Sequence, residues 1–169
     1  SRVYRSQDRR RVSRNLSRPV DRDSPNRLPR FAYCRRGDAG GGVCATLPYP
    51  DCYRTEETPE RVLQQFAERL EQTLATRQVA AVITEAGIVT GWGSTVVAPK
   101  GYLALVRRLM ERYGTVMILD EVGTGFSRCG RLFGLELDGV VPDVVTMAKG
   151  ITNGGAAMGA VVMREDLAE

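Results

Sequence analysis

The sequence contains no histidine among its 169 residues. This absence excludes every site that needs an imidazole, such as a Ser-His-Asp triad, a Cys-His dyad or a zinc site with a histidine ligand. The four cysteines form no C-x-x-C pair and are too few for a disulfide scaffold. No apolar run approaches the ~20 residues of a membrane-spanning helix, and the first residues contain no secretory h-region. We therefore expect a cytoplasmic protein without a membrane partner.

Lysine is also scarce, because only Lys100 and Lys149 occur among 24 basic residues. A GC-rich codon bias accounts for most of this ratio. Arginine cannot supply a neutral primary amine, however, so a lysine that persists in such a chain is a candidate for amine chemistry.

The positive charge is concentrated at the start of the chain, where residues 1–40 hold 12 Arg and 4 Asp. Few apolar residues, no sustained periodicity and an excess of Arg, Ser, Asp and Pro are typical of a disordered segment. We therefore separate a basic, disordered or aberrant segment, residues 1–45, from a folded part, residues 46–169. A nucleic-acid-binding arm is the alternative, but aromatic residues are nearly absent and acids are interleaved, so we expect no nucleic-acid partner.

From about residue 46, apolar periodicity predicts alternating helices and strands. Thr58 followed by Pro59 is a typical helix start, and Gly114 a typical helix end. The predicted helices cover residues 58–77 and 102–113, with a short one at 132–137; the predicted strands cover residues 79–83, 116–119, 144–147 and 159–163; and residues 87–101 form a long loop. This alternation predicts an α/β fold with a mostly parallel sheet and flanking helices, with its strands buried on both faces.

Ionisable residues follow three of these strands, at Glu85, Asp120, Glu121 and Lys149. Because the carboxyl ends of parallel strands share one edge, we expect these side chains to lie together. The alternative is that they are merely solvated strand ends. The small and apolar neighbours of Lys149 favour a desolvated, nucleophilic amine that can form a Schiff base with a carbonyl. With Asp120 as partner of a heteroaromatic cation, this is the arrangement that binds pyridoxal 5'-phosphate (PLP).

Two long motifs carry a family resemblance. Residues 120–130 read D-E-V-G-T-G-F-S-R-C-G, and residues 140–150 read V-V-P-D-V-V-T-M-A-K-G. In order and spacing they resemble the class III, or omega-type, aminotransferases, whose motifs are D-E-V-x-T-G-F-x-R-x-G, V-x-P-D and A-K-G. The resemblance covers about residues 46–169. Because family members are much longer, the chain resembles a central fragment.

The resemblance implies a partial large domain of the PLP-transferase fold (fold type I) and a homodimeric enzyme. Its reaction would move an amino group between an amino acid or amine donor and a 2-oxo acid acceptor. Lys149 matches the lysine that binds PLP and shuttles the proton, and Asp120 the acid that keeps the ring nitrogen protonated. Glu85 matches the acid of an E-P element near the cofactor, and Val122 completes the cofactor-binding D-E-V motif. For Glu121 a structural ion pair with Arg128 is the alternative to a role at the cofactor.

Departures from the family pattern are as informative as the matches. Ala86 replaces the proline after the E-P glutamate, Gly123 replaces a glutamine that reaches the cofactor, and Thr90 replaces the second glutamate of members that act on terminal amines. The aromatic-His-Gly element, the Gly-Ser/Thr phosphate loop and the small domain have no counterpart in these residues. The second hypothesis is therefore a truncated or frameshifted fragment of such an enzyme with no activity of its own.

Overall fold

A computed structural model describes residues 30–35, 43–89 and 95–168 of the chain. A six-stranded sheet contains β1 (Arg30–Arg35), β2 (Val43–Pro48), β3 (Val79–Glu85), β6 (Val116–Asp120), β7 (Val144–Met147) and β8 (Ala160–Met163). A small two-stranded sheet contains β4 (Ile88–Val89) and β5 (Val96–Val97). The α-helices are α2 (Pro59–Ala75) and α3 (Tyr102–Tyr113), and the short 3₁₀ helices are η1 (Gly134–Leu137), η2 (Lys149–Ile151) and η3 (Glu165–Leu167). None of the helices in these ranges is long and apolar enough to cross a membrane.

The large sheet has the strand order β2-β1-β3-β6-β7-β8. Its three central strands β3, β6 and β7 run parallel, which confirms the α/β class expected from the alternating pattern. On both sides of this centre the pairing is antiparallel, between β7 and β8 and between β3, β1 and β2. The parallel centre is the part that matters for function, because its three strands end at the same edge.

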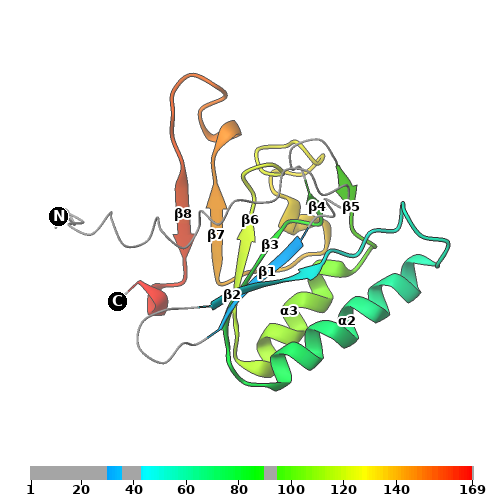
Figure 1. Cartoon of the computed structure of the whole chain (residues 1–169). Helices are drawn as coiled ribbons and strands as arrows, with labels where there is room; N and C mark the ends of the chain where they lie inside the picture. Colours follow the sequence, from blue (N-terminus) through cyan, green and yellow to red (C-terminus); the bar gives the residue numbers. More distant parts are fainter. Residues whose placement is uncertain (1–29, 36–42, 90–94, 169) are drawn as a thin grey trace.

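The helices α2 and α3 lie side by side and cover one face of the sheet (Figure 1). The α2 helix begins as the sequence predicts, since the Thr58 side chain accepts a hydrogen bond from the Arg61 N–H. Gly114 ends α3 in the left-handed conformation, with φ +64°. Gly101 precedes α3 and has no side chain to cap it, so Asp138 does so from a distant loop: its carboxylate accepts the N–H groups of Gly101 and Leu103 at 3.3 and 2.9 Å.

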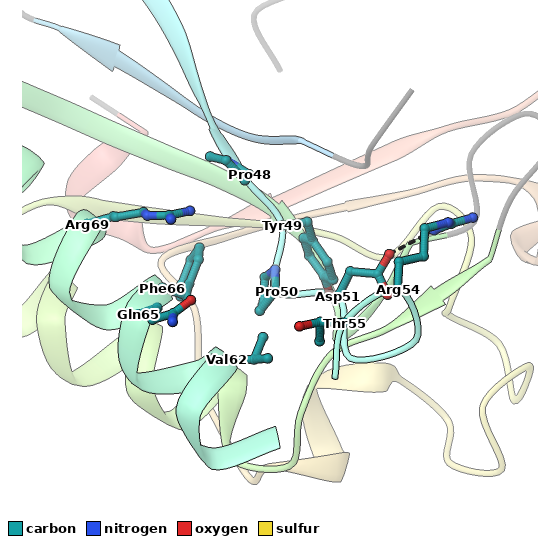
Figure 2. Close-up of a pocket in the computed structure, with 10 residues that line it drawn as sticks. All are labelled: Pro48, Tyr49, Pro50, Asp51, Arg54, Thr55, Val62, Gln65, Phe66 and Arg69. Carbon is teal, nitrogen blue, oxygen red and sulfur yellow. Dashed lines mark hydrogen bonds and ion pairs between the residues drawn. The ribbon is translucent and has the colours of Figure 1, made fainter. Parts of the chain in front are cut away.

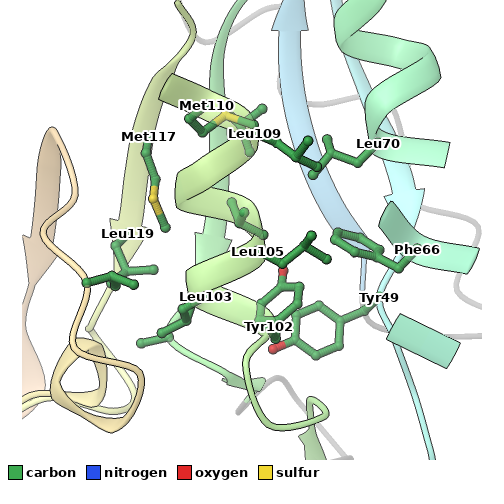
Figure 3. Close-up of a cluster of buried hydrophobic side chains, with 14 of the residues drawn as sticks. Tyr49, Phe66, Leu70, Tyr102, Leu103, Leu105, Leu109, Met110, Met117 and Leu119 are labelled. Atoms are coloured by element: carbon green, nitrogen blue, oxygen red, sulfur yellow. The ribbon is translucent and has the colours of Figure 1, made fainter. Parts of the chain in front are cut away.

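The hydrophobic core fills the space between these helices and the sheet (Figure 3). Its centre is Tyr102, which is 1% exposed and packs in tilted geometry against Tyr49 and Phe66, with ring centroids 5.1 and 5.3 Å apart. The Tyr102 hydroxyl shares a 2.7 Å hydrogen bond with Thr84 Oγ1, so its polar end is also satisfied. Aliphatic residues from both helices and from β3 and β6 complete the cluster: Leu70, Leu74, Val82, Val106, Met110, Met117 and Leu119. Each contributes about 1.5–3 kcal/mol by burial.

The opposite face of the sheet is less covered. Along β3, only Val79, Val82 and Thr84 are fully buried, and their neighbours are half-buried. The expectation that these strands are buried on both faces is therefore wrong for the described part of the chain, because α2 and α3 lie on the same side. The outer strand β8 is exposed, with Val161 and Val162 each 57% exposed.

Two regions differ from the sequence-based expectation. Strands β1 and β2 lie largely before the expected boundary at residue 46, and the loop expected over residues 87–101 contains the strands β4 and β5. The residues of β1 are flanked by arginines, whose composition obscures the short apolar run F-A-Y-C. The strands β4 and β5 are two residues each, too short for a periodic pattern.

Candidate cofactor site

The predicted site residues meet at the carboxyl ends of the three central strands. In the β3–β6 register Glu85 lies opposite Asp120, and in the β6–β7 register Asp120 lies opposite Thr146. The Glu121 N–H donates to the Thr146 carbonyl at 2.9 Å, which fixes β7 against the end of β6. Lys149 follows three residues after Thr146 and begins η2. The structure therefore places Glu85, Asp120 and Lys149 at or just beyond the carboxyl ends of three neighbouring parallel strands.

Asp120 is held in place by the backbone that follows it. Its Oδ1 atom accepts the Val122 N–H at 2.8 Å, and its side chain is half-buried. This Asx-type turn fixes the carboxylate at the end of β6. Val122 therefore contributes its backbone N–H to the site, and any residue except proline could supply this group.

Lys149 has an unusual backbone and an exposed position. Its φ is +46°, in the left-handed region that non-glycine residues seldom occupy. The residue is exposed, as is Gly150. The expected desolvation of the Lys149 amine is therefore wrong for this chain, because the residues that precede it on β7 are only half-buried and its outer neighbour β8 is itself exposed.

Glu121 is completely buried, at 0% exposed. Its carboxylate accepts the Gly134 N–H at 3.0 Å, the Leu135 N–H at 2.7 Å and the hydroxyl of Thr124. The alternative of an ion pair between Glu121 and Arg128 is wrong. Arg128 is exposed, and the described partners of Glu121 are neutral hydrogen-bond donors. The carboxylate thereby ties η1 to the end of β6.

The tight fit around Gly134 is a feature that sequence reasoning missed. A Cβ atom on Gly134 would lie 2.8 Å from the Cβ of Ala86 and 3.2 Å from Glu121 Oε2. Ala86, which stands where the family has proline, is fully buried at this contact. The only available signal was the pairing of a small residue after β3 with a glycine at the start of η1.

Glu85 is half-buried at the end of β3 and lies near Tyr49. Burial, followed by the proximity of Tyr102 and of the Glu85 carboxylate, raises the pKa of the Tyr49 hydroxyl far above its usual value. This hydroxyl is buried and has no hydrogen-bond partner among the described residues. Of the other two substitutions in the family pattern, Gly123 is buried and Thr90 lies outside the described residues.

The described cavities lie away from Lys149. The pocket in Figure 2, about 190 Å³, lies between the end of β2 and α2 and contains the Asp51–Arg54 ion pair, whose atoms are 2.7 Å apart. A second cavity of about 390 Å³ adjoins Arg107 and Asp143, and a third of about 300 Å³ is lined mainly by apolar residues around Val140. Within the described ranges, no group of His, Cys, Asp and Glu side chains has the arrangement of a metal site.

The donor set at the sheet edge fits two ends of PLP. The primary amine of Lys149 suits an aldehyde, and the fixed carboxylate of Asp120 suits a protonated ring nitrogen. Both come from neighbouring parallel strands, at the edge where α/β sheets bind their ligands.

An α/β sheet with an amine and a carboxylate at the ends of adjacent parallel strands defines a class of cofactor-binding domain, and comparison with known proteins identifies the family. The model of the class-III aminotransferases matches residues 40–169. The chain belongs to this family.

Among curated proteins, the chain is 39% identical over 125 residues to an adenosylmethionine-8-amino-7-oxononanoate aminotransferase of Anoxybacillus flavithermus, covering 72% of this chain and 27% of that protein. It is 38% identical over 116 residues to an aminotransferase of Gibberella zeae, covering 67% of this chain and 22% of that protein. Among solved structures, an (S)-enantioselective omega-transaminase from Thermomicrobium roseum matches with a TM-score of 0.64 and 39% identity, over 72% of this chain and 28% of the other. The chain thus spans about a quarter of the length of the relatives that it matches.

Proposed function

We propose that this chain carries the cofactor-anchoring part of a PLP-dependent aminotransferase, with Lys149 as the anchoring residue. The observation that supports the proposal is that Asp120 and Lys149, which lie in the family motifs, are found at the end of β6 and just beyond the end of the parallel strand β7. The reaction would transfer an amino group from an amino acid or amine to a 2-oxo acid. A PLP-bound amine transaminase from an uncultivated Pseudomonas species matches the fold with a TM-score of 0.65 and 35% identity, which supports PLP as the cofactor.

Each proposed site residue has a distinct task. When bound, PLP supplies an electron sink for the carbanion left after an amino acid loses its α-proton. The Lys149 Nζ atom would hold PLP through its aldehyde carbon, with loss of water, and once displaced by a substrate amine would carry a proton to and from the substrate α-carbon. The Asp120 carboxylate would keep a proton on the ring nitrogen, and the Val122 N–H keeps that carboxylate oriented. Glu85, in register with Asp120, would border the same cofactor.

Covalent trapping tests the proposal. The purified chain is incubated with PLP, reduced with borohydride, digested and examined by peptide mass spectrometry. We expect the cofactor on Lys149, with Lys149→Arg abolishing the adduct because a guanidinium does not form the linkage. Lys100→Arg is the matched control, since it removes the only other lysine. An adduct on Lys100 alone, or one that survives in Lys149→Arg, would contradict the assignment.

The exposure of Lys149 and the short span of the chain favour a second candidate, a fragment that does not retain PLP. Dialysis distinguishes the two candidates. A chain with an intact site retains PLP and its absorbance after dialysis, whereas a fragment without one loses both. We propose that residues 46–169 form part of a fold type I large domain and that the complete enzyme is a cytoplasmic homodimer. The strands β1 and β2, which begin before residue 46, belong to the same sheet and therefore to the same domain. On gel filtration, elution at the volume of a particle of twice the chain mass would support the dimer, provided that it persists in Val162→Lys, which weakens pairing through the β8 edge.

A further inference from the structure

Lys149 has a left-handed backbone conformation that neither the family motifs nor the proposed chemistry explain. Left-handed φ values at bulky residues are uncommon and cost energy, so they persist only where the surroundings enforce them. Here Lys149 (φ +46°) and Phe126 (φ +60°) both adopt such values, one after β7 and the other after β6. The two unusual residues belong to loops that meet at the same edge of the sheet.

The meeting point is the contact between Phe126 and Gly150. A Cβ atom on Gly150 would lie 2.6 Å from the Cβ of Phe126 and 3.0 Å from its ring atoms, closer than real Cβ atoms approach one another. The Phe126 side chain therefore packs directly on the backbone of Gly150. Only glycine fits at this position without a shift of the neighbouring atoms, so the Phe126 side chain and the backbone beside Lys149 constrain one another.

The loop that carries Phe126 is itself fixed. The Gly125 N–H donates to the Glu121 carbonyl at 2.9 Å, and the Ser127 N–H donates to the Leu132 carbonyl at 3.1 Å. The ring of Phe126 packs edge-on against Phe133, with centroids 5.4 Å apart. Because the buried Glu121 carboxylate also holds the start of η1, the loop is bonded at both ends, and these bonds oppose a shift that would relieve the contact.

We propose that Phe126 is a positioning residue that holds Lys149 in its left-handed conformation and so directs its amine from the sheet edge. The second half of this statement rests on the proposed function, whereas the first does not. Removing the ring should let residues 149–150 relax to an ordinary backbone conformation. Adding a Cβ at Gly150 should displace the same residues by steric overlap. The two changes act on one contact, so their effects should not be additive.

Nuclear magnetic resonance of the full chain labelled with ¹³C,¹⁵N-lysine tests the backbone effect, because the chain gives only two lysine signals. Lys149→Arg assigns them. In Phe126→Ala the Lys149 Cα and amide resonances should move toward their values in urea, while those of Lys100 stay in place and report an intact fold. Leu132→Ala, an exposed residue of the same loop, is the control and should move neither. An unchanged Lys149 signal in Phe126→Ala would overturn the proposal.

Two further measurements complete the test. Gly150→Ala should shift the Lys149 signal, and Phe126→Ala with Gly150→Ala should give a smaller effect than the two single changes added together; strict additivity would contradict a shared contact. In the PLP trapping assay, Phe126→Ala should lower the yield on Lys149 on the order of tenfold, because the amine is misdirected. If the wild-type chain attaches no PLP while the variants show the expected resonance shifts, the proposed function is refuted and the positioning role stands. Unchanged trapping despite shifted resonances would refute the directing role.

Discussion

Glu121 illustrates, at the scale of single residues, what a carboxylate needs inside a protein. A buried charge without partners is strongly unfavourable, but here two backbone N–H groups and one hydroxyl point at the carboxylate. The two N–H groups belong to the first turn of η1 and would otherwise have no acceptor. Glu121 and η1 therefore satisfy one another, directly beside Asp120.

Replacing Glu121 with Gln should be destabilising. Glutamine keeps the size of the side chain but turns one acceptor into an NH₂ donor that faces other donors, which costs about 1–3 kcal/mol. The measurement is the urea midpoint of unfolding, followed by circular dichroism. The exposed Glu56 provides the control, since Glu56→Gln should leave the midpoint unchanged. Equal midpoints for both variants would show that the carboxylate charge is not needed at position 121.

The site residues were predictable to the extent that chemistry alone identifies them. Asp120 and Lys149 follow apolar strands, and parallel strands share an edge, so their convergence follows from pattern and topology. The partners of Glu121 were not predictable in this way, because two of them are backbone N–H groups of a turn that depends on the fit between Gly134 and Ala86. The exposure of Lys149 was also not predictable, since it depends on which elements cover β7 and β8.

Asp143 acts at the scale of secondary-structure elements, where it joins four of them. Its Oδ2 accepts the Met117 N–H of β6 at 2.8 Å and Arg107 Nη1 of α3 at 2.9 Å, and its Oδ1 accepts Arg164 Nη1, next to β8, at 2.8 Å. The side chain is 6% exposed, just before β7. Because Lys149 follows the far end of β7, this junction fixes the strand that leads into the proposed site.

The stability of the fold should depend on pH through Asp143. Burial alone would raise the pKa of this carboxyl, but the Met117 N–H, Arg107 and Arg164 outweigh it and hold the pKa below its usual value. A carboxylate with a lowered pKa stabilises the fold above the unfolded-state value, about pH 4, and loses that contribution as the pH falls through the folded-state value.

Asp143→Asn should therefore lower the stability at pH 7 by about 1.5–3 kcal/mol and also make its decline between about pH 5 and pH 2 less steep. Urea titrations across this range measure both effects. Glu165→Gln, an exposed change on the neighbouring η3, should retain the wild-type profile. An acid limb in Asp143→Asn as steep as in the wild type would mean that other carboxyls dominate it.

The regular elements were predictable where local signals agree with tertiary structure. Thr58 with Pro59, and Gly114 after Tyr113, mark helix ends that lie within two residues of the observed ones. The strands β1 and β2 were not predictable, because their place in the sheet depends on backbone pairing and not on a pattern of their own: β1 pairs with β3, and β2 pairs with β1.

At the scale of the whole molecule, the structure is one layer of helices on a sheet whose other side is only partly covered. Strand β8 is the outer strand of this sheet among the described residues, and Val161 and Val162 are exposed on its opposite faces. An uncharged, exposed edge strand of this kind is a template for pairing with another chain.

We expect the isolated chain to self-associate through β8. Val162→Lys should shift association to higher protein concentration, because a charge on an edge strand opposes pairing. Sedimentation velocity over a concentration series is the measurement. Val97→Lys is the matched control, since Val97 is 61% exposed but lies in the separate small sheet. If both lysine variants suppress association equally, net charge and not the β8 edge controls it.

The capping of α3 by Asp138 has a consequence for the order in which parts of the protein fold during synthesis. A ribosome releases Tyr102–Tyr113 well before Asp138 leaves the exit tunnel, so the nascent helix first exists with the amides of Gly101 and Leu103 bound only to water. Its first turn becomes complete only when the following strand and η1 have been synthesised and have brought the carboxylate back. The first turn of α3 therefore gains its last hydrogen-bond acceptor only after β6 and the loop that follows it have folded.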